Sequence, residues 1–181
     1  MPEQNSLNTK PTESGPSEKQ IVVFRLGSER FGIVIELVRE ILRHQEVTHV
    51  PKAATGLLGV IDLRGQVTPV MALDTRLQLP PSERTSDSRI MVVDVDGREI
   101  GMVVDEVIEV VRFASDLVDP IPMSMRVSRA TYVNGIARLE EGLTILLDIE
   151  RIALDVDLGS LDQAAQLAEA QPRSGSPQAA A

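Results

Sequence analysis

The feature that most constrains the fold is a series of short β-rich runs joined by two-residue turns. Gly27-Ser28 suits a type II′ hairpin turn, and Asp96-Gly97 suits a type I′ turn because both of its positions take positive φ. Arg64-Gly65 separates another pair of such runs. The pattern predicts about ten strands, over residues 21–26, 29–35, 38–43, 57–63, 66–73, 89–95, 98–104, 107–113, 130–139 and 143–147.

Short strands at this spacing favour barrels or a sandwich over an alternation of strands and helices. The polar stretch 80–88 (PPSERTSDS) separates the hairpins into two groups, and we therefore expect two small units with a break there. Helices are predicted to be few. A turn or so is expected over 74–79, and Asp148 is a candidate N-cap for a helix over 149–154.

The two ends of the chain differ in composition from this middle part. Residues 1–19 and 172–181 are rich in Pro, Ser and other small or polar residues, which predicts disordered tails. A weak helix is expected over 156–171, where Ser160 and Gln163 resemble a capping box. The folded domain is therefore expected over 20–155.

Charge and composition exclude several classes of protein. The chain has 18 Lys and Arg against 27 Asp and Glu, and only 2% of its residues are aromatic, so it lacks the cationic field and stacking platforms of a nucleic-acid binder. With no cysteine, disulfides and thiolate chemistry are excluded. No apolar run is long enough to insert into a membrane, and the first twenty residues lack the apolar stretch of a signal peptide, so a cytoplasmic protein is expected.

The sequence also shows no motif typical of a catalytic or metal-binding site. His44 and His49 are the only histidines, and their spacing suits neither a helix face nor a strand face. An Asp-Val-Asp-Gly stretch resembles part of a calcium loop but would place Val92 and Val103 at ligand positions. Asp105 is expected to face solvent or to act as a local cap. We expect no cofactor, no metal and a non-enzymatic binding module, the alternative being a small enzyme that uses carboxylates in a barrel cleft.

Several stretches, in order, resemble the CheW-like domain family of chemotaxis coupling proteins. The segment 31–51 resembles the start of such a domain, and GVIDLRGQVTPV over 59–70 is similar to the family block GVxNLRGxxxPV. GMVVDEV over 101–107 is similar to the block GxxVDxV, and Gly-Ile-Ala at 135–137 and Leu-Leu-Asp-Ile at 146–149 follow at suitable distances. The resemblance covers about 20–165.

This resemblance implies both a fold and a function. The implied fold is all-β dominated, with two five-stranded SH3-like β-barrels packed on a shared core and short helices, one of them C-terminal. The implied function is that of a non-enzymatic adaptor in a bacterial chemosensory signalling array. Such an adaptor couples the cytoplasmic tips of methyl-accepting chemoreceptors to the regulatory domain of a CheA-type histidine kinase.

The resemblance also implies two binding sites. Receptor binding is expected at a groove rim where Arg64 lies close enough to pair with Glu40, and where Gly59 and Gly65 permit close backbone approach. A solvated surface pair is the alternative for Arg64 and Glu40. The expected receptor-binding residues are Val38, Glu40, Gly59, Asp62, Arg64 and Gly65, and the expected kinase-binding residues are Asp119, Pro120, Ile121, Pro122 and Met123.

Two departures from the family pattern bear on the partner. Asp62 stands where the family usually has asparagine, and Ala72 and Asp74 stand where a PVxDLR stretch would have aspartate and arginine. These changes leave open two variants of the adaptor role. One is a scaffold of a specialised chemosensory pathway, such as one for surface motility. The other is an inhibitory scaffold that binds the kinase but not receptors.

Overall fold

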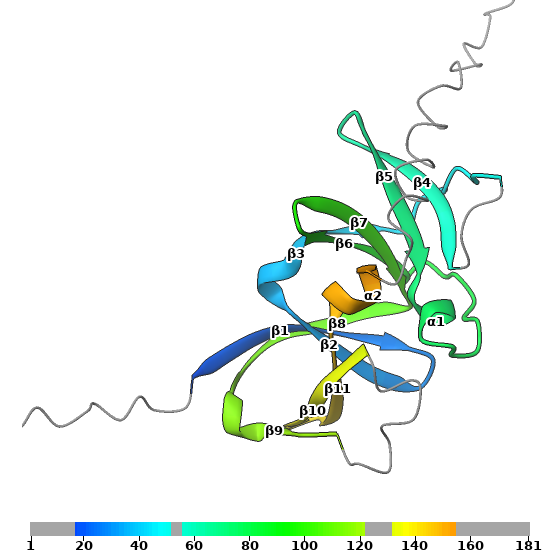
Figure 1. Cartoon of the computed structure of the whole chain (residues 1–181). Coiled ribbons are helices and arrows are strands. Elements are labelled where there is room, and N and C mark those ends of the chain that lie inside the picture. Colours follow the sequence, from blue (N-terminus) through cyan, green and yellow to red (C-terminus); the bar gives the residue numbers. More distant parts are fainter. Residues whose placement is uncertain (1–16, 52–55, 122–131, 155–181) are drawn as a thin grey trace, which may run out of the picture.

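The computed structural model describes residues 17–51, 56–121 and 132–154. Within these residues lie eleven strands, two 3-10 helices and two short α-helices (Figure 1). In chain order the elements are β1 (Glu18–Leu26), β2 (Glu29–Val34), η1 (Ile35–Leu37), β3 (Val38–Arg43), β4 (Leu57–Leu63), β5 (Gln66–Ala72), α1 (Leu73–Arg76), β6 (Arg89–Val95), β7 (Arg98–Val104), β8 (Glu106–Ala114), η2 (Ser115–Leu117), β9 (Val118–Asp119), β10 (Val133–Leu139), β11 (Gly142–Leu147) and α2 (Ile149–Leu154).

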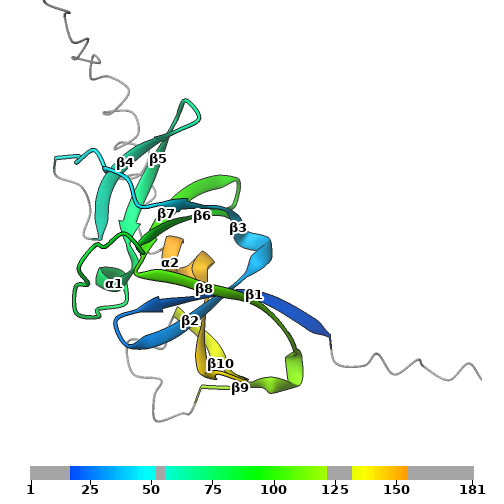
Figure 2. The ribbon, with the colours of Figure 1, turned by 180° about the vertical axis from the view of Figure 1, so that it is seen from behind.

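The strands form two sheets, one nested inside the other along the chain. The six-stranded sheet has the order β8-β1-β2-β11-β10-β9, and the five-stranded sheet has the order β3-β6-β7-β5-β4. The first sheet therefore takes its strands from both ends of the described chain, and the second takes its strands from the middle. Figures 1 and 2, which are opposite views, show the two sheets one above the other with α2 between them.

This topology corrects the expected break at 80–88. That stretch connects α1 to β6, and the strands on either side of it belong to the same five-stranded sheet. Each sheet contains one parallel pairing between strands that are distant in the sequence, β5 with β7 in the five-stranded sheet and β11 with β2 in the six-stranded sheet. Such long-range pairings leave no local signal, so grouping the hairpins by their position in the chain gave the wrong division.

Three apolar clusters account for the way the sheets pack. One cluster lies within the five-stranded sheet and includes Ile61, Val70, Ile90, Val92 and Val103. A second lies within the six-stranded sheet and includes Ile21, Val23, Phe113, Ala137 and Leu146. The largest draws on both sheets and on α2, with Phe24, Leu26, Met71, Met91, Met102, Ile149 and Ile152 among its members. Each SH3-like barrel thus has its own interior, and the two barrels share one core, as expected.

Most of the expected strands are confirmed, in several cases to the residue. The runs 38–43, 57–63, 89–95 and 98–104 coincide with β3, β4, β6 and β7. Both residues of Asp96-Gly97 have positive φ, at 52° and 78°, as a type I′ turn requires. The two-residue strand β9 was not predicted, because two residues carry no periodicity.

The ends of the domain agree only in part with expectation. β1 begins at Glu18 and pairs with the end of β8, so the tail predicted over 1–19 is wrong at Glu18 and Lys19. The helix expected over 149–154 is α2, where the backbone N–H of Arg151 donates to Asp148 Oδ1 at 3.1 Å. The helix predicted over 156–171 and the tail over 172–181 lie outside the described residues. In the part of the chain that is described, no helix has the length and apolar character needed to cross a membrane.

Candidate functional site

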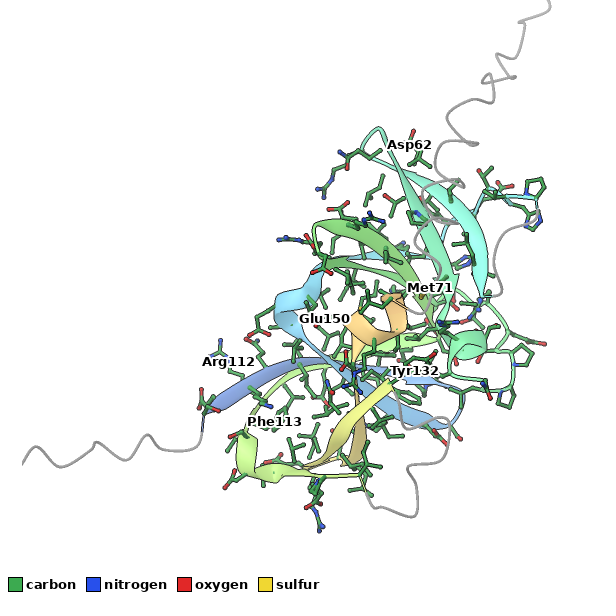
Figure 3. All side chains as sticks on the ribbon, viewed as in Figure 1. Asp62, Met71, Arg112, Phe113, Tyr132 and Glu150 are labelled. Atoms are coloured by element: carbon green, nitrogen blue, oxygen red, sulfur yellow. The ribbon has the colours of Figure 1, made fainter. Side chains whose placement is uncertain are left out.

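The tip of the β4–β5 hairpin is the centre of the expected receptor site, and Figure 3 shows Asp62 there. Arg64 and Gly65 form the turn, with φ of 54° and 85°. The Gly65 backbone N–H donates to Asp62 Oδ1 at 2.7 Å, so this carboxylate caps the turn. An asparagine side chain presents the same acceptor oxygen. The aspartate at position 62 therefore preserves the local geometry of the hairpin while adding a negative charge to its surface.

An ion pair connects this tip to the opposite edge of the five-stranded sheet. Arg64 Nη2 lies 3.0 Å from Glu40 Oε2, with the arginine side chain 79% exposed and the glutamate 21% exposed. Glu40 is on β3 and Arg64 follows β4, and these are the two edge strands of the sheet. The predicted pairing is thus confirmed as a contact. An exposed pair contributes only about 0–1 kcal/mol to stability, so its main effect is to orient the two side chains.

A second junction between the same edges lies at Gly59. Thr48, in the segment that follows β3, exchanges two backbone hydrogen bonds with Val60, each of 2.9 Å. A Cβ placed on Gly59 would lie 2.0 Å from the Thr48 carbonyl oxygen. The expected close approach is confirmed at Gly59. At Gly65 no other segment of the chain approaches, since a Cβ would meet nothing within 4 Å, and the positive φ accounts for the glycine.

The six expected receptor-binding residues therefore lie on one sheet but not at one point. Glu40, Asp62, Arg64 and Gly65 gather at the hairpin tip. Gly59 lies further back along β4, where it accommodates Thr48. Val38 is half-buried at the start of β3 and packs against the shared core. A partner that covers the tip would contact the first four residues directly.

A further ion pair lies next to this site, on β3 and β6. Arg39 Nη2 is 2.6 Å from Asp94 Oδ2. The Arg39 guanidinium, followed by the Gly97 backbone N–H, lowers the pKa of the Asp94 carboxyl, and the carboxylate in turn raises the pKa of Arg39. Sequence reasoning missed this pair, since nothing in the chain before folding places Arg39 opposite Asp94.

The expected kinase-binding stretch begins on the other sheet. Asp119 ends β9, and its carboxylate accepts a hydrogen bond from Arg138 Nε on β10. Pro120 is exposed and Ile121 is half-buried. Leu117, just before β9, is 43% exposed and adds apolar surface. Pro122 and Met123 lie outside the described residues.

A third polar cluster was not expected. Asp74, only 1% exposed, contacts Arg84, and Arg84 also lies near Asp105. The Asp105 side chain is 12% exposed, and its Oδ2 accepts a hydrogen bond from Gly27 N–H at 2.7 Å. Both expectations for Asp105 are therefore wrong: the side chain is largely buried, and the turn that it caps is distant in the sequence rather than local. The only feature of the sequence that pointed to this cluster was Asp74 itself, which stands where the family stretch PVxDLR has arginine.

In the described part of the chain, no group of three His, Cys, Asp or Glu side chains is placed to hold a metal ion. What the described residues do offer is two small SH3-like barrels on one core, with charged side chains paired across exposed strand edges and turns. This architecture defines a class: a compact scaffold that presents surfaces to other proteins.

Comparison with known proteins identifies the family. Residues 20–156 match the model of the CheW-like domain, and the chain belongs to that family. It is similar to the probable chemotaxis protein CheW of Rhizobium etli, with 28% identity over 75% of this chain and 87% of the relative. The chemotaxis protein CheW of Helicobacter pylori is 30% identical, over 74% of this chain and 80% of the relative.

A solved structure supports the same assignment. The crystal structure of the scaffolding protein TtCheW from Thermoanaerobacter tengcongensis matches with a TM-score of 0.69 and 31% identity, over 77% of this chain and 90% of that chain. CheW family proteins are non-enzymatic. The chain is therefore a non-enzymatic scaffold of the chemotaxis signalling type.

Proposed function

We propose that this chain couples methyl-accepting chemoreceptors to a CheA-type histidine kinase, in the cytoplasm, as part of a membrane-associated chemosensory array. The observation that carries the proposal is membership of the CheW-like family over residues 20–156, joined to two separate candidate faces on two different sheets. A coupling protein needs two faces because both partners must be bound at once.

The receptor face is proposed at the edges of the five-stranded sheet, with Glu40, Asp62, Arg64 and Gly65 in direct contact with the receptor tip. Gly59 and Val38 support it from behind. The Glu40–Arg64 pair presents one acidic and one basic group in a fixed arrangement. Such a pair selects partners whose own charges are complementary, and it repels partners with the opposite arrangement.

The kinase face is proposed at residues 119–123, with Asp119, Pro120, Ile121, Pro122 and Met123 in contact with the kinase regulatory domain. Binding both partners raises the effective concentration of each at the other, which strengthens weak individual contacts. A change in receptor packing then reaches the kinase as a coupling free energy, typically about 1–3 kcal/mol between two sites.

The first test is calorimetric titration of the full chain with the regulatory domain of a CheA-type kinase from the same organism. Saturable one-to-one binding supports the proposal, and no heat of binding to any such domain contradicts it. The second test is co-sedimentation of the kinase with receptor-containing membranes, with and without this chain. Kinase binding without receptor recruitment would instead identify an inhibitory scaffold.

The receptor face is tested by the charge reversal Arg64→Glu. We expect it to impair recruitment to receptor membranes while leaving kinase binding and the melting temperature unchanged. The double variant Glu40→Arg/Arg64→Glu restores the ion pair with reversed polarity, and Arg112→Glu on β8 is the matched control away from the face. Normal recruitment of the Arg64→Glu variant would remove the receptor face from this position.

A further inference from the structure

Asp74 is a buried carboxylate in the first turn of α1. It is 1% exposed, and its oxygens accept hydrogen bonds from the backbone N–H groups of Thr75 and Ser82, at 2.6 and 3.1 Å. The second of these bonds fastens the stretch between α1 and β6 onto α1. Asp74 therefore acts as an anchor on the five-stranded side of the molecule, to which α1 belongs through its contacts with β5 and β7.

Arg84, in the same connection, links this anchor to a second carboxylate. Its Nη2 lies 3.2 Å from Asp74 Oδ2, and its Nη1 lies 3.7 Å from Asp105 Oδ1. Arg84 Nη1 and Asp105 Oδ1 are both buried, and neither forms a hydrogen bond. The two atoms face each other as an ion pair slightly longer than a hydrogen bond, so each depends on the other for compensation of its buried polarity.

Asp105 is the residue at which the chain crosses from one sheet to the other. It lies between β7 of the five-stranded sheet and β8 of the six-stranded sheet. Its backbone N–H donates to the Arg25 carbonyl at 3.1 Å, and its side chain accepts from Gly27 N–H. Both partners belong to β1 and the turn after it. Asp105 therefore ties the crossing point to the six-stranded sheet.

We propose that Arg84 is a positioning residue that fixes the orientation of the two barrels relative to each other, through the bridge Asp74–Arg84–Asp105. This inference rests on the proposed function for its consequence: with the receptor face on one barrel and the kinase face on the other, the bridge makes the two faces move as one body. A scaffold whose barrels pivoted freely would bind both partners but transmit less of any change between them.

The shared apolar core and the bridge constrain the two barrels in different ways. Apolar burial drives association but has no directional preference, so it resists separation of the barrels more strongly than a small rotation. Hydrogen bonds do depend on direction, and Arg84 Nη2 to Asp74 and Gly27 N–H to Asp105 are bonds of this kind. The bridge supplies directional contacts at the crossing point, where a small rotation is amplified most at the distant faces.

The test variant is Asp74→Asn/Arg84→Gln, which removes both charges and leaves the net charge unchanged. The matched control is Arg39→Gln/Asp94→Asn, which neutralises an ion pair that lies wholly within the five-stranded sheet. The chain has no cysteine, so spin labels can be attached at introduced cysteines alone. Exposed positions Arg43 on β3 and Leu143 on β11 place one label on each sheet.

The readout is the width of the label-to-label distance distribution measured by pulsed electron paramagnetic resonance. We expect the distance distribution of the test variant to be about twice as wide as that of the wild-type protein, because barrels released from one orientation sample several. The control variant should have the wild-type width. An unchanged distribution in the test variant overturns the proposal. If that variant does not fold, Arg84→Lys decides instead, because a single ammonium cannot span both carboxylates; an unchanged width there overturns the proposal equally.

The functional arm measures kinase phosphorylation with and without receptor membranes. In the test variant we expect the affinity for each partner to stay within about two-fold of wild type while the receptor-dependent change in kinase activity falls several-fold. Full receptor control in a variant with a broadened distribution would overturn the coupling role and leave only the orienting role. If the wild-type chain binds neither partner, the proposed function fails, while the distance measurement still decides whether the bridge sets the orientation.

Discussion

The close approach at Gly59 gives the sharpest prediction of stability. In Gly59→Ala the new Cβ would lie 2.0 Å from the Thr48 carbonyl oxygen, 2.8 Å from the Thr48 carbonyl carbon and 3.0 Å from Val47 Cγ1. Because Cβ atoms do not approach backbone oxygens within 3.0 Å, the segment at Thr48 must move by at least about 1 Å. That movement breaks the pair of 2.9 Å hydrogen bonds between Thr48 and Val60.

The expected cost follows from these contacts. Two backbone hydrogen bonds contribute about 1–3 kcal/mol together, and an alanine at a φ of +151° adds about 1–2 kcal/mol of backbone strain. The total is about 2–5 kcal/mol. Gly65→Ala is the matched control, because its φ is +85° but its Cβ would meet nothing within 4 Å, so it carries strain alone.

The assay is equilibrium unfolding in urea, with hydrogen exchange of the Thr48 and Val60 amides as a local probe. We expect Gly59→Ala to lose at least about 1 kcal/mol more than Gly65→Ala and to lose protection at both amides. Equal losses of stability in the two variants would refute the steric argument. Retained protection at Thr48 and Val60 would refute the claim that this junction closes the sheet edges.

Three further predictions concern single side chains. Thr144 is fully buried and its Oγ1 has no hydrogen-bond partner in the structure, so Thr144→Val should raise the free energy of unfolding by about 1 kcal/mol; a loss in urea titration would mean that the hydroxyl is satisfied. Ile152 is fully buried in the shared core, and Ile152→Ala should cost about 2–5 kcal/mol in one cooperative transition seen by calorimetry, whereas two separate transitions would show that the barrels unfold independently. The pKa of Asp94 is lowered by Arg39, so the pair stabilises the fold above the ordinary carboxyl pKa, and that contribution disappears as the pH falls through the lowered value. Arg39→Gln should raise the Asp94 pKa in a carboxyl NMR titration, and an unchanged midpoint would contradict this cause.

Local features of the sequence predicted local structure well. Asp96-Gly97 could be assigned as a type I′ turn because few residue pairs tolerate positive φ twice in succession. The run that became β4 is bounded by Gly56 on one side and by the turn Arg64-Gly65 on the other. The Asp148 cap could be predicted because it is also local: its side-chain oxygen accepts a hydrogen bond from an N–H only three residues away.

Long-range features could not be predicted in this way. The assignment of strands to sheets depends on parallel pairings such as Phe31 with Ile145, which are specified by the packing of both faces rather than by any turn. Arg84 lies in a polar stretch that looks like a solvated linker, and only the fold brings it to Asp74 and Asp105. The Glu40–Arg64 contact was anticipated through family resemblance, because nothing in spacing alone joins residues on opposite sheet edges.

The nesting of one sheet inside the other has a consequence for synthesis on the ribosome. The strands of the five-stranded sheet are contiguous in the chain from Val38 to Val104, so this barrel can form while the rest is still being made. The β1–β2 hairpin emerges first but must wait for β11, its parallel neighbour, since Phe31 pairs with Ile145. Until then the β1 side chains that face the interior of the six-stranded sheet, Ile21 and Val23, lack Ala137 and Leu146, which cover them in the folded domain. We therefore expect the middle of the chain to fold before its ends during synthesis, with the first hairpin completed only when the last strands have emerged.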